Sequence, residues 1–185
     1  HPDHVQAEWA KSGIMPLLKN TYHAILLYGS RTLYDPVKEY GLPRSVEKKV
    51  VTCGYVGRTQ PSVSREDTRR DLALRSDRLV LVTPGGGDDG YPLLKTYVTM
   101  LRKRFASRRP DFDTLIVTGP LMSPEQHRRL QQAASPELAL TVLHFTPRLY
   151  EFLAAADLVV SMRGYNTVVE ILTANQRGII VPRTR

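Results

Sequence analysis

From residue 49 onward the sequence repeats one arrangement: a short run of aliphatic and β-branched residues, then a glycine-rich or polar turn, then an amphipathic segment. This alternation is typical of a parallel sheet covered by helices, because parallel strands need a crossover connection between them. Several runs are too short for helices and apolar on both faces, as strands of a covered sheet should be. The expected strands are Lys49–Cys53, Leu79–Thr83, Thr114–Thr118, Ala139–Phe145, Leu158–Ser161 and Gly178–Val181. We therefore predict an α/β fold with a parallel sheet and helices on both faces.

Amphipathic segments lie between these strands. The segment Tyr91–Ser107 spaces its apolar residues at intervals of three and four, which predicts a helix with one buried face. Ser123 and Pro124 supply an N-cap serine and a proline at the first helical position, so a helix should begin there and continue to about Ala134. Three further helices are expected at Arg65–Leu74, Pro147–Ala155 and Asn166–Ala174.

Residues 1–45 differ from this pattern. We expect an amphipathic helix around Gln6–Lys11, a hydrophobic run at Ala24–Tyr28, and a connection between two lobes around Gly41-Leu42-Pro43. The chain begins without methionine, and the expected strand Gly178–Val181 should be buried yet lacks a following helix to cover it. We therefore expect part of a longer protein: residues 1–45 as the remnant of an N-terminal lobe with its inter-lobe linker, and residues 46–185 as a domain truncated at its C-terminal end.

Composition narrows the classes of function. Among the 185 residues no apolar stretch approaches the roughly 18 that a membrane span needs. The single cysteine, Cys53, which we expect to be buried, excludes an internal disulfide framework and a cysteine-based zinc cluster, as suits a cytoplasmic protein. The histidines show no metal-ligand spacing, so we expect no bound metal.

The formal charge of +8 comes largely from one region. Arg102-Lys103-Arg104 and Arg108-Arg109 close the predicted helix Tyr91–Ser107, where cations also complement the helix dipole. We interpret them as a solvated face, and no nucleic-acid partner is expected. A peripheral membrane contact stays an alternative, because clustered Lys and Arg attract phosphate-rich surfaces.

The turn after the predicted strand Leu79–Thr83 contains Gly85-Gly86-Gly87, followed by Asp88-Asp89-Gly90 and a helix. Glycines let the backbone approach a ligand and turn its N–H groups toward an anion at a helix N-terminus. The same loop is also compatible with an ordinary tight turn. Asp88 and Asp89 would repel a phosphate, so we interpret them as helix caps, with contact to a sugar or an acceptor as the alternative.

The turn after the predicted strand Leu158–Ser161 is Met162-Arg163-Gly164-Tyr165-Asn166-Thr167. Gly164 should permit a sharp reversal, and Asn166 or Thr167 should cap the next helix and expose N–H groups to a phosphate. Glu170, three residues after Thr167, shares its helix face and is placed to accept both hydroxyls of a ribose. A capped helix with a glutamate near its positive end is the alternative. Arg163 either neutralises phosphate or is a surface arginine.

This second turn and its flanks carry a resemblance to a known family. The run from Phe145-Thr146 through Ala154-Ala155-Ala156-Asp157 to Gly164-Tyr165-Asn166-Thr167 and Glu170 resembles the donor-binding half of MurG-like, family 28 glycosyltransferases. The Gly85-Gly86-Gly87 loop is similar to the glycine-rich phosphate loop of the same lobe. The resemblance covers roughly residues 46–185 and implies one Rossmann-like lobe of a GT-B fold, in which two lobes face a cleft.

The resemblance also implies roles for single residues. Glu170 would bind the ribose hydroxyls, and Thr146 would offer backbone groups to the base edge, with Phe145 packing nearby. The catalytic base is expected in the other lobe. From its place at a strand end, His144 is either a base or a structural residue, and we expect a structural residue because lone histidines are more often that. The residues expected to bind the donor are Gly85, Gly86, Gly87, Phe145, Thr146, Arg163, Gly164, Tyr165, Asn166, Thr167 and Glu170.

The implied function is transfer of a hexosyl group from a nucleoside-diphosphate sugar, a UDP-sugar first, to an acceptor, with no tightly bound cofactor. These residues alone are expected to bind the nucleotide weakly without turnover. Two alternatives stay open. One is a nucleotide-sugar epimerase or hydrolase of the same architecture. The other is a noncatalytic module that binds a nucleotide or another anion.

Overall fold

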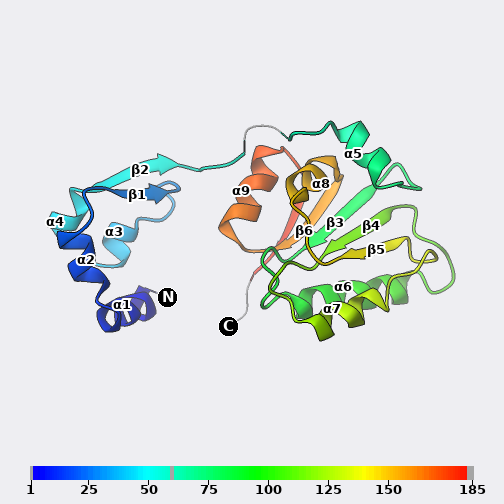
Figure 1. The fold of residues 1–185 in the computed structure, drawn as a ribbon, viewed down its shortest axis with the longest axis horizontal. Helices are drawn as coiled ribbons and strands as arrows, with labels where there is room; N and C mark the ends of the chain where they lie inside the picture. The colour runs from blue at the N-terminus through cyan, green and yellow to red at the C-terminus, as the bar shows by residue number, and fades with distance from the viewer. Residues whose placement is uncertain (1, 59–60, 183–185) are drawn as a thin grey trace. The chain divides into compact units, whose positions relative to one another are not determined.

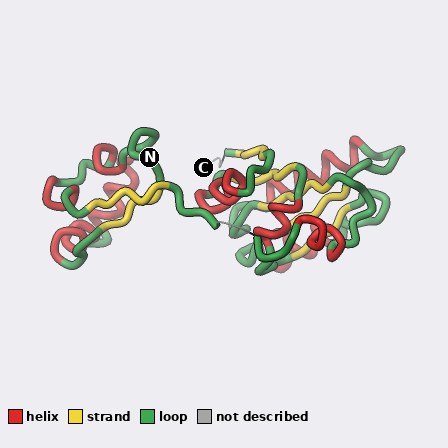
Figure 2. The backbone as a smooth tube through the Cα atoms, turned by 90° about the horizontal axis from the view of Figure 1, so that it is seen from above, coloured by secondary structure: helices red, strands yellow, loops and turns green. Residues whose placement is uncertain are grey.

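The computed structural model describes residues 2–58 and 61–182. The chain divides into two compact units, His1–Val56 and Gly57–Arg185, each of which is described by itself. In both units strands and helices alternate along the chain (Figures 1 and 2). None of the described helices is long and apolar enough to cross a membrane.

The first unit pairs two parallel strands, β1 (Ile25–Tyr28) and β2 (Val50–Gly54), with Ile25 opposite Val50. Lys49, just before β2, donates from Nζ to the carbonyl oxygens of Leu18, Lys19 and Tyr22 at 3.2, 2.6 and 2.9 Å, which satisfies orphan carbonyls where a helix ends. The helices of this unit are α1 (Pro2–Lys11), α2 (Ile14–Asn20), α3 (Pro36–Glu39) and α4 (Arg44–Glu47).

The division between the units differs from the expected one. The predicted strand Lys49–Cys53 is β2, and it pairs with β1 in the first unit, so the division falls after Val56 and not after residue 45. Gly41-Leu42-Pro43 lies between α3 and α4 inside the first unit and does not connect lobes. Cys53 is exposed, not buried. An apolar run predicts that a segment forms a strand, but it does not predict the neighbouring strand with which that segment pairs.

The second unit is built on one parallel sheet with the order β5-β4-β3-β6-β7. Its elements follow in the order α5 (Arg65–Asp71), β3 (Leu79–Thr83), α6 (Tyr91–Arg104), β4 (Asp113–Val117), α7 (Pro124–Gln131), β5 (Leu140–Leu143), α8 (Leu149–Ala155), β6 (Leu158–Met162), α9 (Tyr165–Thr173) and β7 (Gly178–Val181). Ser123 caps α7 as predicted, accepting from the N–H of Gln126 at 3.3 Å. The predicted parallel sheet with alternating helices is thus confirmed.

Helices cover both faces of this sheet (Figure 1). Along each strand alternate side chains point to opposite faces, so Val82 packs in one core and Leu81 in the other. The first core includes α6 and α7 residues such as Leu94 and Leu130, and the second includes α8 and α9 residues such as Leu153 and Ile171. The strand β7 was expected to be buried but is largely exposed in the described residues, with Ile179 53% exposed.

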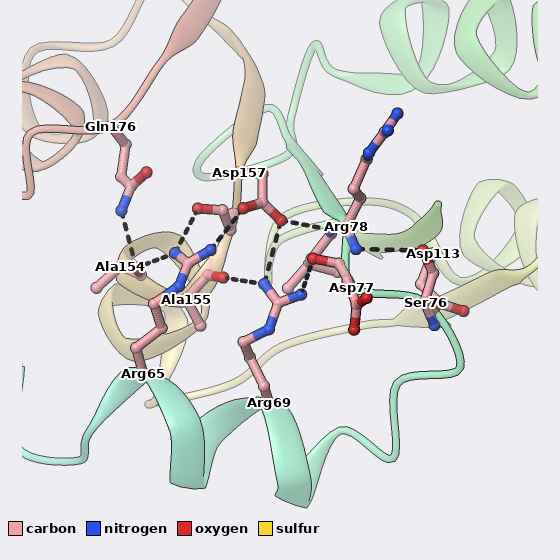
Figure 3. Close-up of polar contacts among 12 residues, drawn as sticks. Arg65, Arg69, Ser76, Asp77, Arg78, Asp113, Ala154, Ala155, Asp157 and Gln176 are labelled. Atoms are coloured by element: carbon pink, nitrogen blue, oxygen red, sulfur yellow. Dashed lines mark hydrogen bonds and ion pairs between the residues drawn. The ribbon is translucent and has the colours of Figure 1, made fainter. Parts of the chain in front are cut away.

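A polar network holds α5 and α8 at the amino ends of the strands (Figure 3). Arg65 and Arg69 on α5 donate to carbonyl oxygens at the end of α8, and both contact the carboxylate of Asp157. Asp157 also accepts the N–H of Leu79 at the start of β3, at 2.7 Å. We call Arg65, Arg69 and Asp157, with that N–H, the Asp157 network. It joins a helix, a helix end and a strand at the edge opposite the predicted site.

Candidate functional site

Both turns singled out in the sequence follow neighbouring strands. In β3 and β6 Thr83 lies opposite Ser161, so the loops after these two strands leave the sheet side by side. Within the sheet, β4 and β5 follow on one side of β3, whereas β6 and β7 lie on the other side of β3. Such a reversal of strand order opens a crevice at the carboxyl ends of the strands, which is where ligands bind in open α/β sheets.

The two loops contact each other. A Cβ atom on Gly85 would lie 3.3 Å from Oγ1 of Thr167, which places the glycine loop against the first turn of α9. Thr167 is 8% exposed, so its side chain is part of the packing between the loops and does not face solvent. The structure therefore brings Gly85 and Thr167 together, as the predicted site requires.

The helix after the glycine loop begins later than expected. α6 starts at Tyr91, and its N-cap is Gly90, with no side chain capping it. Asp88 and Asp89 are exposed residues of the preceding turn, so neither is the N-cap. Gly90 is packed on Pro84, because a Cβ at Gly90 would lie 2.3 Å from the ring of that proline. The glycine loop therefore does not sit at the N-terminus of α6.

Gly87 lies where the backbone of the glycine loop packs against the backbone of the loop after β4. A Cβ on Gly87, where φ is 98°, would lie 2.3 Å from the carbonyl oxygen of Thr118 in the loop after β4. A Cβ on Gly119 would in turn lie 2.3 Å from the carbonyl oxygen of Gly85. The two backbones also share a hydrogen bond from the N–H of Leu121 to the carbonyl of Gly86 at 2.9 Å. Gly87 is thus buried by protein, whereas Gly86 stays exposed.

Replacing Gly87 with alanine should destabilise the second unit by about 3 kcal/mol, because the new methyl group overlaps a carbonyl and φ lies in the left-handed region. Urea unfolding followed by circular dichroism measures the loss. Gly164→Ala is the matched control, and its cost should stay below about 1 kcal/mol because a Cβ there meets no atom within 4 Å. Equal losses in the two variants would contradict this account of Gly87.

The turn after β6 differs in detail from the prediction. Gly164 has φ −129° and ψ 136°, an extended conformation open to any residue, so it makes no sharp reversal. Gly164 itself is the N-cap of α9, and no side chain caps that helix, so Asn166 and Thr167 are not caps. The N–H groups of a first helical turn have no partner within the helix. With open space around Gly164, this end of α9 can receive an anion.

The other side chains of this turn are exposed. Arg163 follows β6 with its side chain exposed, while its N–H donates to the carbonyl of Val181 on β7 at 3.0 Å. Tyr165 and Asn166 are exposed at the start of α9. A guanidinium and an amide beside an open helix end add donors for phosphate oxygens.

Glu170 lies in the second turn of α9 and is mostly buried, with 17% of its side chain exposed. Burial raises the pKa of its carboxyl group, and the positive charge of Arg58 opposes that rise. The Nε atom of Arg58 lies 3.4 Å from Oε1 of Glu170. A carboxylate kept in an unfavourable environment beside an open loop is typical of a functional residue. Glu170 lies beyond the first turn of α9, where the effect of the helix dipole is weak.

Exchanging Glu170 for glutamine should change stability in a pH-dependent way. At about pH 3 the carboxyl is protonated in both the folded and the unfolded chain, and the two proteins should differ in stability only by the exchange of an acid for an amide. Above that pH the glutamate ionises in the unfolded chain before it ionises in the folded chain, because the folded pKa is raised. The wild-type protein therefore loses stability as the pH rises, whereas the glutamine variant does not. Thermal midpoints measured from about pH 3 to pH 8 should separate progressively in favour of the variant as the pH rises. A separation in the opposite direction would contradict the raised pKa.

The loop after β5 completes the rim. The carbonyl of His144 accepts the N–H of Gly119 at 2.8 Å, which joins this loop to the one after β4. Phe145 is 61% exposed, and the hydroxyl of Thr146 accepts the N–H of Arg148 at 3.0 Å. The rings of His127 and His144 lie 4.9 Å apart, centroid to centroid. The loops after β5, β4 and β3 are therefore bound to one another, and the last of them contacts α9.

A cavity of the second unit lies away from these loops. It has a volume of about 480 Å³ and is lined at the amino ends of the strands by residues such as Leu79, Asp113 and Leu140. Its ionisable lining residues are Arg75 and Asp113, and it lies at the end of the sheet opposite the reversal of strand order, so we do not place the site there. In residues 2–58 and 61–182, His, Cys, Asp and Glu form no group of three or more that could hold a metal ion.

Two residues of the site region were missed by the sequence reasoning. Gly119 follows a predicted strand directly, and its place in a Thr-Gly-Pro turn is a signal that could have been used. Arg58 gave no signal, because it is distant in sequence from Glu170 and lies in an irregular segment. Among the predicted residues, Phe145 and Thr146 lie on a loop that is hydrogen-bonded to the loop after β4, which in turn is hydrogen-bonded to the glycine loop.

Comparison with known proteins gives a family and a fold. Residues 79–185 match the glycosyltransferase family 28 C-terminal domain. The chain is 33% identical over 140 residues to the UDP-N-acetylglucosamine–N-acetylmuramyl-(pentapeptide) pyrophosphoryl-undecaprenol N-acetylglucosamine transferase of Desulfitobacterium hafniense (strain Y51), a match over 74% of this chain and 37% of that protein. It is 28% identical over 141 residues to the transferase of the same name from Moorella thermoacetica (strain ATCC 39073 / JCM 9320), over 72% of this chain and 37% of that protein.

A solved structure supports the architecture. The crystal structure of the glycotransferase of kitacinnamycin aligns with a TM-score of 0.52 and 17% sequence identity, covering 100% of this chain and 44% of that one. At this identity the likeness shows the fold alone. The parallel sheet between two helical layers is thus a Rossmann-like lobe of the GT-B type. The chain spans 37% of the length of the two curated relatives.

Proposed function

The chain belongs to glycosyltransferase family 28, and from this premise we propose that its second unit binds the nucleoside diphosphate of a nucleotide sugar for transfer of a hexosyl group. One observation carries the proposal: the glycine loop after β3 contacts the uncapped start of α9 at the point where strand order reverses. Gly85 and Thr167 mark that contact.

The diphosphate is assigned to the open end of α9. The first-turn N–H groups of the helix and its dipole favour a negative charge there, and Gly164 leaves space for an approaching ligand. Gly86 is exposed and adds a flexible backbone contact, while Gly87 supports the loop from behind. Arg163 supplies a positive charge that stabilises the leaving nucleoside diphosphate as the glycosidic bond breaks.

The ribose is assigned to Glu170. An ionised carboxylate accepts hydrogen bonds from two neighbouring hydroxyls, which a diol such as ribose supplies. The loop of Phe145 and Thr146 then offers backbone groups to the base. Uracil is our first choice of base, because the curated relatives are named as transferases that use UDP-N-acetylglucosamine.

The rest of the reaction is assigned outside the described site. We infer that the acceptor and the catalytic base belong to the other lobe of the GT-B fold, so that the second unit alone binds a nucleotide without turnover. The relatives act on pyrophosphoryl-undecaprenol acceptors by name, which supports contact of the whole enzyme with a membrane surface.

Calorimetric titration with UDP, GDP and TDP tests the proposal. We expect selective binding of one base, with UDP tightest, and an affinity that depends only weakly on salt. Affinity that falls steeply with salt for every nucleotide would contradict it and indicate a polyanion-binding surface. With the whole two-lobed enzyme and labelled UDP-sugar, label recovered on an acceptor supports transfer, whereas label recovered only in water or in an inverted sugar would indicate a hydrolase or an epimerase.

A further inference from the structure

The segment that enters the second unit is pressed against α9 beside Glu170. A Cβ on Gly57 would lie 2.5 Å from Oγ1 of Thr173 and 3.0 Å from Cγ1 of Val169, the residue before Glu170. A side chain at this position would force the side chain of Thr173 to move. Because Gly57 lies against this part of α9, the next residue, Arg58, lies beside the helix turn that contains Glu170.

Arg58 is held on a second helix as well. The hydroxyl of Tyr150 on α8 donates to the carbonyl oxygen of Arg58 at 3.1 Å. The guanidinium carbon of Arg58 lies 5.7 Å from the centre of the Tyr150 ring, within the range of a cation–π contact. With these two contacts fixed, Nε of Arg58 reaches Oε1 of Glu170 at 3.4 Å.

We propose that Arg58 is a positioning residue for Glu170, which orients the carboxylate and keeps it ready to accept two ribose hydroxyls. The inference rests on the proposed function and extends it to a residue outside the family's matched region, residues 79–185. A carboxylate offers about four acceptor positions. Arg58 forms an ion pair with Oε1 at 3.4 Å, and Oε2 is left for the diol.

Charge adds to orientation. Burial raises the pKa of Glu170, and the charge of Arg58 lowers it. Arg58 and Arg148 also act on the carboxylate of Glu151 on α8. The charged groups from the entering segment and α8 are therefore these two arginines and Glu151. Without Arg58 the carboxyl of Glu170 would stay protonated to a higher pH. A protonated carboxyl has lost an acceptor position, and a diol then binds it less well.

A purely structural ion pair would not affect ligand binding. The side chain of Arg58 is 59% exposed, and exposed ion pairs contribute little to stability. We therefore expect Arg58→Gln to lower the unfolding temperature only slightly at neutral pH, where the carboxylate of Glu170 has lost a compensating charge. Its effect should be seen in ligand binding.

Titration with UDP and with 2′,3′-dideoxyuridine diphosphate tests the inference. The wild-type protein should prefer UDP, and Arg58→Gln should weaken UDP binding about fivefold at neutral pH while leaving the dideoxy analogue unchanged. The loss should grow as the pH falls toward 6, and Arg58→Lys should recover part of the affinity. Arg78→Gln, which removes an exposed pair with Asp111 at the start of β3, is the matched control and should bind as wild type.

The outcomes separate two failures. If the wild-type protein binds UDP and its dideoxy analogue equally, the ribose assignment and the proposed function fail. If the wild-type protein discriminates and Arg58→Gln discriminates equally well at every pH, only the positioning role of Arg58 is overturned. A parallel loss for both ligands in Arg58→Gln would also overturn it, because the effect would then not act through the diol.

Discussion

Replacing Glu170 with alanine should lower the affinity for UDP about a hundredfold, which corresponds to about 2.8 kcal/mol. The reason is the loss of two hydrogen bonds to a charged acceptor in a partly buried place, each worth about 1.5 kcal/mol. The side chain is 17% exposed, so water cannot fully replace the carboxylate. Calorimetric titration of the purified variant with UDP measures the change.

A matched glutamate separates this effect from loss of charge. Glu125 on α7 is exposed and pairs with Arg128 and Arg129 of the same helix at 2.8 Å each. Glu125→Ala removes the same charge from the same unit and should bind UDP as wild type. If the two alanine variants lose affinity equally, Glu170 acts only through net charge, and the assignment of the ribose to it must be withdrawn.

The place of the candidate site could be predicted because it depends on local patterns. Short β-branched runs predicted β3 and β6, and the glycines of Gly85-Gly86-Gly87 and Gly164 marked the turns that follow them. In a parallel sheet all such turns leave from one edge. The resemblance to family 28, now confirmed by the match of residues 79–185, was carried by these same turns.

The internal geometry of the site could not be predicted, because it depends on contacts between distant segments. Gly87 must be a glycine because the carbonyl oxygen of Thr118 lies against it. The residues near Gly87 in the sequence do not indicate that the loop after β4 will pack there. The late start of α6 at Tyr91 goes with the packing of Gly90 on Pro84. Arg58 reaches Glu170 only once the segment after the first unit lies on α9.

The same limit explains the division between the units. Lys49–Cys53 has the composition of a strand, and the structure makes it β2. Its partner, however, is β1, which precedes it by a loop and two short helices, and not β3, which follows. Strand propensity acts within a segment, whereas strand pairing is decided by which faces can be buried together.

The Asp157 network shows how the second unit is held at the edge away from the proposed ligand (Figure 3). Oδ2 of Asp157 accepts the N–H of Leu79 at 2.7 Å and a guanidinium N–H of Arg69 at 3.1 Å, and Oδ1 accepts from Arg65 at 2.5 Å. One carboxylate therefore joins α5 and β3 to the end of α8. Burial would raise the pKa of Asp157, but the N–H of Leu79, Arg69 and the charge of Arg65 lower it on balance.

Replacing Asp157 with alanine should destabilise the second unit by about 2–3 kcal/mol, because a backbone N–H and two guanidinium groups lose a charged acceptor at once. Urea unfolding at neutral pH measures the loss. Asp111→Ala is the control, and it should cost less than about 1 kcal/mol because its pair with Arg78 is exposed.

The pH dependence of that loss tests its electrostatic origin. A folded pKa below the usual value means that ionised Asp157 stabilises the native state above about pH 4, and that this stability disappears as the pH falls through the folded pKa. The difference between wild type and Asp157→Ala should therefore stay constant from about pH 8 to pH 5 and shrink below about pH 4. A difference that persists undiminished in acid would mean that Asp157 stabilises the fold by packing and not as an ionised acceptor. In that case α5 is held by the bonds of Arg65 and Arg69 to the carbonyls of α8, which do not depend on a carboxylate.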